Sequence, residues 1–161
     1  MNEHYLIALG SNRRHARYGS PRAALEAAAP YIEFGGAEMR AMSSIWRTRP
    51  VGPAQREFAN AAAIISSDLT PHAMMAMLHG VERVFGRERR GQRWRERELD
   101  LDIILWSGGA IADFGLSIPH PRFRERDFVL GPAAEIARDW RDPITGLTVA
   151  QLNARLKRGP K

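Results

Sequence analysis

The stretch at residues 97–105 holds the side chains best suited to chemistry. Apolar and acidic residues alternate strictly from position 99 to position 103, which predicts a β-strand with one apolar and one polar face. Asp100 and Asp102 then point the same way and lie about 6.5–7 Å apart along the strand. Two carboxylates at this spacing can hold a pair of cations, and magnesium suits them. The alternative is a plain solvated face, although aspartate is depleted in strands and like charges on one face repel.

The segment just before this strand is rich in arginine. Positions 83–97 contain seven arginines and two glutamates. Such a run is typical of a solvated surface or of a patch that contacts RNA. Because it leads directly into the strand with the two aspartates, it can also fold over phosphates, whose oxygens the guanidinium group binds bidentately. Aspartates, magnesium and an arginine lid together indicate phosphoryl-type transfer. The sequence contains neither a Walker A loop nor a protein-kinase signature.

Length and composition limit the possible protein classes. The 161 residues, of which 44% are hydrophobic and 26% charged, predict one globular domain over 1–161. The absence of cysteine excludes disulfides, thiolate metal sites and cysteine nucleophiles, and it fits a reducing, cytoplasmic location. We expect neither a signal peptide nor a membrane span. The net charge of +6 favours a negatively charged partner, which can be nucleic acid, an acidic surface or a phosphorylated small molecule.

The order of predicted elements indicates an α+β fold. The expected elements are a strand at 5–9 ended by a sharp turn at Gly10, a helix capped by Ser20-Pro21 that Pro30 helps to end, strands at 39–46 and 60–65, a helix opened by Thr70-Pro71, and the strand at Leu99. This β-α-β-β-α-β order predicts a ferredoxin-like core, an antiparallel sheet with its helices on one face. Additional C-terminal helices are predicted at 128–137 and 149–156.

Several short motifs occur in an order that points to a known family. They are Arg47-Thr48, Pro50-Val51-Gly52-Pro53, Phe58 with Asn60, Arg87 and Arg89, Trp94, Arg97, the alternating strand at 99–103, and Pro119-His120-Pro121 followed by Arg126 and Phe128. As a set they resemble the 6-hydroxymethyl-7,8-dihydropterin pyrophosphokinases. These enzymes of folate biosynthesis transfer the terminal pyrophosphate of ATP to the hydroxymethyl group of a reduced pterin. The likeness runs from Gly10 to about Ile136.

The resemblance implies a catalytic group made of Arg87, Arg97, Asp100 and Asp102. The two aspartates would coordinate two magnesium ions that bridge the triphosphate of the co-substrate ATP. The pterin hydroxyl would attack the β-phosphorus in line, and AMP would leave. The two arginines would reach the phosphates when their loop closes, and closure would exclude the water that competes as a nucleophile.

The resemblance also implies two binding sites. The pterin site would consist of Thr48, Val51, Phe58, Asn60, Trp94 and Phe128. The ATP site would consist of His79, Glu82, Arg89, Arg93, Ile103, Ser117, His120 and Arg126. Asn60 offers a donor and an acceptor to the amide-like edge of the pterin, and aromatic rings can cover its faces. Taken without the resemblance, the sequence favours Phe58 and Phe128 as core residues and Asn60 as a buried strand amide.

The chain departs from the usual family pattern near the lid. Arg95-Glu96 replaces a common Gly-Pro pair, Glu98 a threonine, Arg49 a proline and Arg13 a leucine, and Gly115 occupies a position where an arginine can occur.

The sequence as a whole leaves three hypotheses. The first is a monomeric magnesium-dependent diphosphotransferase acting on small molecules, without nucleic-acid or membrane partners. The others are a diverged paralogue acting on another reduced pterin and a non-catalytic RNA-binding module of ferredoxin-like fold.

Overall fold

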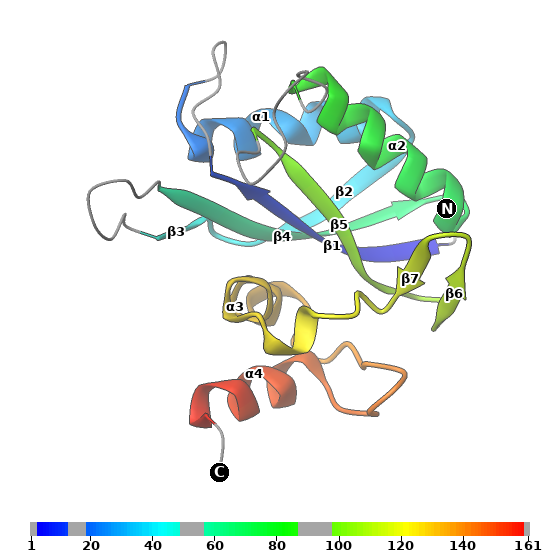
Figure 1. The fold of residues 1–161 in the computed structure, drawn as a ribbon. Coiled ribbons are helices and arrows are strands. Elements are labelled where there is room, and N and C mark those ends of the chain that lie inside the picture. The colour runs from blue at the N-terminus through cyan, green and yellow to red at the C-terminus, as the bar shows by residue number, and fades with distance from the viewer. Residues whose placement is uncertain (1–2, 13–18, 49–56, 87–97, 160–161) are drawn as a thin grey trace.

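A computed structural model describes residues 3–12, 19–48, 57–86 and 98–159. Two helices cover one side of a central β-sheet; on the other side one helix packs on the sheet and a second helix packs on the first (Figure 1). The elements are β1 (Glu3–Ser11), α1 (Pro21–Phe34), β2 (Ala37–Met42), β3 (Trp46–Thr48), β4 (Phe58–Ser67), α2 (Pro71–Val84), β5 (Asp100–Trp106), β6 (Ile111–Asp113), β7 (Leu116–Ile118), the 3-10 turn η1 (Phe123–Glu125), α3 (Asp127–Ile136) and α4 (Val149–Arg158).

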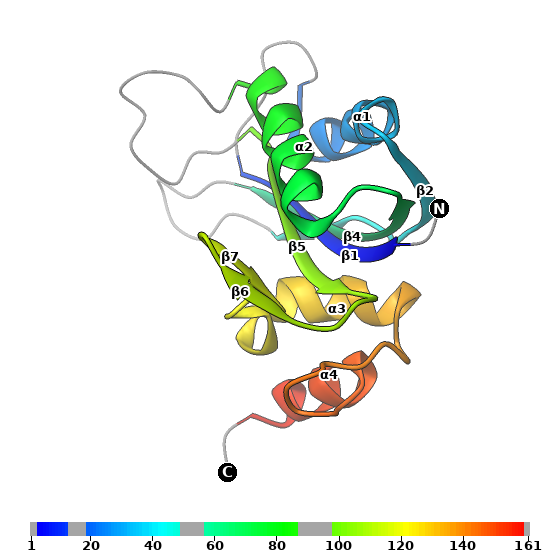
Figure 2. The same cartoon turned by 90° about the vertical axis from the view of Figure 1, so that its right-hand side faces the viewer.

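The main sheet confirms the ferredoxin-like prediction. Its strand order is β2-β4-β1-β5, with β3 also paired to β4, and the pairs are antiparallel. The helices α1 and α2 cover one face, whereas α3 and α4 lie on the other (Figures 1 and 2). Strands β6 and β7 form a separate hairpin. None of the helices in the described ranges is long and apolar enough to cross a membrane.

Alternation along the strands divides the core between the two faces of the sheet. Ile7 and Leu9 of β1 belong to a buried cluster with Leu25 of α1 and Leu78 of α2. Leu6, one residue away on the opposite face, belongs to a second cluster that contains residues of β4, β5, η1, α3 and α4. Because successive strand residues point to opposite faces, the even-numbered residues of β1 and β4 face α3 and α4.

The helix starts follow the sequence signals closely. Ser20 and Thr70 accept hydrogen bonds from the backbone of Ala23 and Ala73, and each is followed by a proline at the first helical position. The predicted C-terminal helices are also present, as α3 and α4. Thr148 and Gln151 form a reciprocal capping box at the start of α4.

Three boundary predictions were wrong. Pro30 lies inside α1, which continues to Phe34, because buried residues before and after it pack on the sheet and offset the lost hydrogen bond. Gly10 does not end β1, since it still pairs with both neighbouring strands. The strand expected at 39–46 is divided into β2 and β3 at the position where the Ser43 hydroxyl, rather than a backbone carbonyl, accepts the N–H of Ala62.

Candidate functional site

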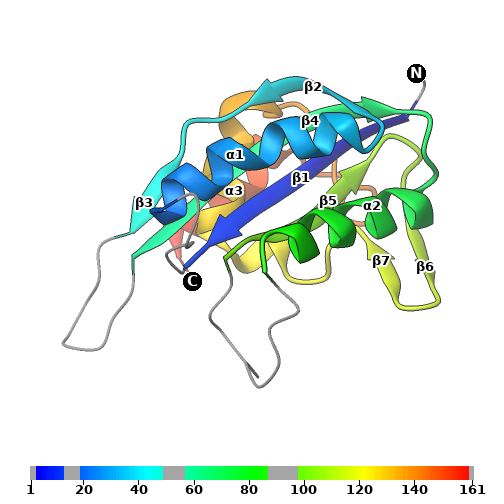
Figure 3. The ribbon, with the colours of Figure 1, turned by 90° about the horizontal axis from the view of Figure 1, so that it is seen from above.

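The two aspartates lie together on the edge strand of the sheet. Asp102 pairs with Ala8 and Asp100 with Gly10 of β1, so both carboxylates are on the even-numbered face, and both are half-buried. Viewed from above, the start of β5 lies near the end of β1 and the β3–β4 end of the sheet (Figure 3). This confirms the alternating strand and brings the acidic pair next to the central strands.

His120 faces this acidic pair from the segment after β7. Its backbone N–H donates to Ile104 O at 3.0 Å, and its Nδ1 accepts from the N–H of Arg122 at 3.1 Å. The neutral ring therefore carries its proton on Nε2, which lies 3.8 Å from Asp102 Oδ2. Burial lowers the pKa of His120, and the nearby Arg126 and Arg122 act in the same direction, whereas Asp102 and Asp100 oppose it. A neutral ring that presents an N–H is the form favoured near neutral pH.

A row of residues crosses four strands on the same face. Strand register aligns Trp46 of β3 with Asn60 of β4, Asn60 with Gly10 of β1, and Gly10 with Asp100 of β5. Directly opposed residues in antiparallel strands project to the same side. A Cβ on Gly10 would lie 3.1 Å from Asn60 Oδ1, so the Asn60 amide lies over the glycine. The strand register thus places the amide and the acidic pair on one surface, and Gly10 leaves space for the amide.

Two aromatic residues that the resemblance assigns to the pterin site lie on β4 and on α3. Phe58 is the cross-strand partner of Thr48, and Phe128 lies in the first turn of α3. The two rings are 40% and 41% exposed, which argues against the alternative that they are core residues. Arg126 holds its guanidinium carbon 5.6 Å from the centroid of the Phe128 ring. The rings are therefore available to a planar ligand.

Glu82 of α2 supports the strand between the two aspartates. It is fully buried, and its Oε2 accepts the backbone N–H of Leu101 at 2.7 Å. Leu101 separates Asp100 from Asp102, so this bond fixes the backbone that carries both. Nearby, a Cβ on Gly86 would lie 2.7 Å from Oε2 of the buried Glu98. Gly86, which follows α2, thus leaves room for the Glu98 side chain, which replaces the threonine common at this position.

Glu82→Ala is expected to lower turnover about 10–100-fold, because the unpaired Leu101 N–H lets the acidic strand shift. Steady-state kinetics with the substrates that the resemblance implies, ATP and the pterin, would measure this. Glu82→Gln keeps an acceptor oxygen and is expected to recover most of the rate. A raised KM for ATP with unchanged kcat would instead indicate the direct ATP contact that the resemblance implies.

The remaining predicted residues divide into three groups. His79 on α2 and Ser117 on β7 are exposed. Ile103 is buried in the core cluster that contains residues of α1 and α2, so its side chain is on the face opposite the aspartates. Outside the described residues lie Val51, Arg87, Arg89, Arg93, Trp94 and Arg97, together with the side chain of Thr48.

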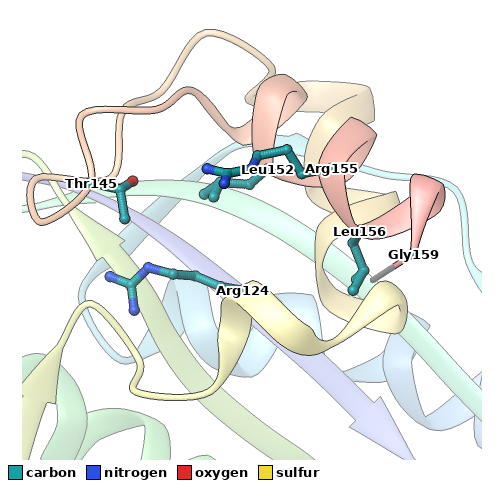
Figure 4. A pocket seen from close by; sticks show the side chains of 6 residues that line it. All are labelled: Arg124, Thr145, Leu152, Arg155, Leu156 and Gly159. Carbon is teal, nitrogen blue, oxygen red and sulfur yellow. The ribbon is translucent and has the colours of Figure 1, made fainter. Parts of the chain in front are cut away.

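Two surface hollows lie on the α3–α4 side of the molecule. One, of about 480 Å³, is lined by Arg124, Thr145, Leu152, Arg155, Leu156 and Gly159, and Figure 4 shows these side chains around the space between η1 and α4. It contains none of the predicted site residues. The other, of about 420 Å³, is lined by the β6–β7 hairpin and includes Ser117, Pro119 and Pro121. The second hollow therefore adjoins the segment that holds His120.

The donor set at Asp100 and Asp102 fits magnesium. Among the described residues there is no group of three or more histidine, aspartate or glutamate side chains arranged to hold a metal ion. Magnesium commonly takes only one or two protein carboxylates and completes its shell with water and substrate phosphates. A pair of half-buried carboxylates on one strand face is a site of this open kind.

Sequence reasoning did not single out Trp46 or the pairing of Gly10 with both neighbouring strands. Both belong to the site through strand register, which pairs residues far apart in the chain. The available signal was Gly10 itself, because a glycine at the end of an apolar strand can mark a close approach as well as a turn.

Comparisons with known proteins point to one family. The family profile of 7,8-dihydro-6-hydroxymethylpterin-pyrophosphokinase (HPPK) matches residues 6–138. Proteins named 2-amino-4-hydroxy-6-hydroxymethyldihydropteridine pyrophosphokinase share 37% identity in Methylorubrum extorquens, over 93% of this chain and 91% of the relative, and 35% in Bacillus subtilis, over 97% and 91%. The Synechocystis relative is 40% identical over 73% of this chain, which spans 60% of that protein.

Solved structures agree on the fold. A crystal structure of HPPK-DHPS in complex with substrates superposes with a TM-score of 0.71 at 10% identity, covering 95% of this chain and 43% of that one. Wild-type Plasmodium falciparum HPPK-DHPS gives a TM-score of 0.71 at 11% identity, covering 95% and 44%. The family profile and the similarity over nearly the full length of two relatives, on a fold that brings the predicted acidic pair and Asn60 together, lead to one conclusion: the chain belongs to the 7,8-dihydro-6-hydroxymethylpterin-pyrophosphokinase family.

Proposed function

We propose that this protein transfers pyrophosphate from ATP to the hydroxymethyl group of 6-hydroxymethyl-7,8-dihydropterin, giving the pterin diphosphate and AMP. The observation that carries the proposal is the row that aligns Asn60, Gly10 and Asp100 across three strands. It provides a site for an amide-like heterocycle beside a site for a metal-bound triphosphate. The names of the relatives support the same reaction.

The described residues have distinct tasks in this reaction. The Asn60 amide donates to and accepts from the pterin edge, while Phe58 and Phe128 cover its faces. His120 directs its Nε2–H toward the region beside Asp102, where it can donate to a phosphate oxygen. Asp100 and Asp102 would hold two magnesium ions, which when bound would neutralise the triphosphate and polarise the phosphorus under attack.

The alternatives are less well supported. An RNA-binding module on this fold stacks bases on aromatic residues of an open sheet face, whereas here residues of α3 pack on the face that carries the aspartates, beside Leu6 and Ala62. A paralogue acting on another reduced pterin would keep the same acidic pair and differ in the pterin site. We further propose one domain over 1–161, a monomeric state and a cytoplasmic location.

The decisive experiment incubates the purified protein with ATP, Mg²⁺ and the dihydropterin and measures AMP by chromatography. AMP release that depends on both substrates would support the proposal. Release with a different reduced pterin only would favour the paralogue. RNA binding without AMP release would favour the binding module.

Gly10→Ala is expected to raise KM for the pterin about 10-fold, because the new Cβ displaces the Asn60 amide by a few tenths of an ångström and recognition depends on its position. KM for ATP should change little. Gly80→Ala on α2 is the matched control, since a Cβ there makes only an ordinary contact, 3.7 Å from Arg83 Nη2. A wild-type pterin KM in Gly10→Ala would remove Asn60 from the pterin site.

A further inference from the structure

Trp46 is held against α3 from two directions. Its indole Nε1–H donates to Glu135 Oε2 at 2.8 Å. Its six-membered ring lies on Gly131, where a Cβ would come within 2.1 Å of Trp46 Cη2. Only glycine leaves room for the ring in this position. The short strand β3 is therefore joined to α3 by both a hydrogen bond and a close packing contact.

Glu135 also binds the chain just before β3. Its Oε1 accepts the backbone N–H and the hydroxyl of Ser44, both at 2.9 Å. Local desolvation favours the neutral acid, but the hydrogen bonds from Trp46 and Ser44 outweigh this and lower the pKa of Glu135. The carboxylate thus stays ionised at neutral pH. It accepts hydrogen bonds from Ser44, which lies between β2 and β3, and from Trp46, the first residue of β3.

The same face of α3 carries Phe128. Positions 128, 131 and 135 are spaced i, i+3 and i+7, which places them on one side of a helix. Two of these positions contact Trp46, and Trp46 is the register partner of Asn60. Fixing Trp46 on α3 therefore fixes the separation between Asn60 in the sheet and the Phe128 ring in the helix.

We propose that Trp46, Gly131 and Glu135 form a bracket that sets the width of the pterin site between Asn60 and Phe128. The bracket residues are positioning residues: they hold the groups that recognise the pterin. This inference rests on the proposed function. It predicts that loosening the bracket weakens pterin binding and leaves ATP binding and the chemical step nearly unchanged.

The test measures KM for ATP and for 6-hydroxymethyl-7,8-dihydropterin, kcat and Tm in a set of full-length variants. Glu135→Ala is expected to raise KM for the pterin about 10-fold with less than about a twofold change in KM for ATP. Glu135→Gln, which keeps one acceptor oxygen, should recover part of that affinity. Glu26→Gln is the matched charge control and should behave as wild type. Glu26 is exposed on α1, and its Oε1 lies 3.8 Å from Arg22 Nε.

Gly131→Ala separates positioning from stability. Alanine is the better helix former, so it favours α3, yet its Cβ must displace the Trp46 ring. We expect a raised pterin KM with only a small fall in Tm, because the helix propensity of alanine offsets part of the cost of displacing the ring. In a Trp46→Phe background, where the outer ring atoms are missing, adding Gly131→Ala should change pterin KM less than about twofold further.

Two results would overturn the inference. If wild type is active and Glu135→Ala and Gly131→Ala keep the wild-type pterin KM, the bracket does not set the pterin site, whatever happens to Tm. If both variants raise the two KM values equally, their effect is not confined to the pterin side. Failure of the proposed function would be seen separately, as absence of pterin-dependent AMP release by the wild type itself.

Discussion

Asp102→Ala is expected to lower kcat at least about 10³-fold while leaving the protein folded. Asp102 is half-buried on an edge strand, and its neighbours Leu101 and Ile103, rather than Asp102, belong to the core. Removing its carboxylate therefore costs little packing. It does remove half of the acidic pair that would hold magnesium, so charge on the triphosphate would go unneutralised in the transition state. Steady-state AMP release at saturating ATP and pterin measures the loss.

The controls for Asp102→Ala separate ligation from charge and from folding. Asp139→Ala removes an aspartate that is 91% exposed and should keep wild-type turnover and Tm. Asp102→Asn keeps one neutral oxygen ligand, and excess Mg²⁺ is expected to restore part of its activity but none of that of Asp102→Ala. A large fall in Tm would instead assign Asp102 a structural role, and an unchanged kcat at unchanged Tm would remove it from the metal site.

Strand β5 and the starts of α1 and α2 could be predicted from the sequence, because side-chain alternation and helix capping within a few residues determine them. Alternation at 99–103 is enough to predict β5, since a period of two places every second side chain on the same face. The Ser-Pro and Thr-Pro pairs predict the starts of α1 and α2, because a hydroxyl cap and a proline satisfy the first turn. The order of these elements then predicts the sheet, given the antiparallel ferredoxin-like arrangement.

The contacts that complete the site could not be predicted in this way. The alignment of Trp46 with Asn60, and of Gly10 with Asp100, depends on register between strands distant in the chain. The space left by Gly131 for the Trp46 ring depends on how α3 packs. The resemblance assigns Asn60 and the aspartates to one site, but it does not indicate which contacts hold them there. Pro30 likewise showed that tertiary packing can override a local helix-breaking signal.

Asp142→Ala is expected to lower the free energy of unfolding by about 3 kcal/mol, the largest stability effect we anticipate. Asp142 is fully buried and accepts from Arg124 Nε at 2.5 Å and Nη2 at 2.8 Å. It also accepts from the Thr145 hydroxyl and the Ile144 N–H. These bonds join η1 to the turn that precedes α4. The side chain of Arg124 is 28% exposed, next to the hollow in Figure 4, so water offsets part of the loss. Chemical denaturation at pH 7 measures the effect.

Lowering the pH should also destabilise the protein, because it protonates Asp142. Burial acts to raise the pKa of Asp142, but the hydrogen bonds from Arg124, Thr145 and Ile144 outweigh it and lower this pKa to about 2 from an ordinary 3.8. A lowered pKa means that the stabilisation is complete above about pH 4 and is lost as the pH falls toward 2, by about 2 kcal/mol. The stability advantage of wild type over Asp142→Asn should therefore shrink across this window.

Glu125→Gln, which removes the exposed ion pair with Arg122, should cost less than about 0.5 kcal/mol at any pH. An Asp142→Asn protein as stable as wild type at pH 7 would mean that the carboxylate adds nothing beyond its shape.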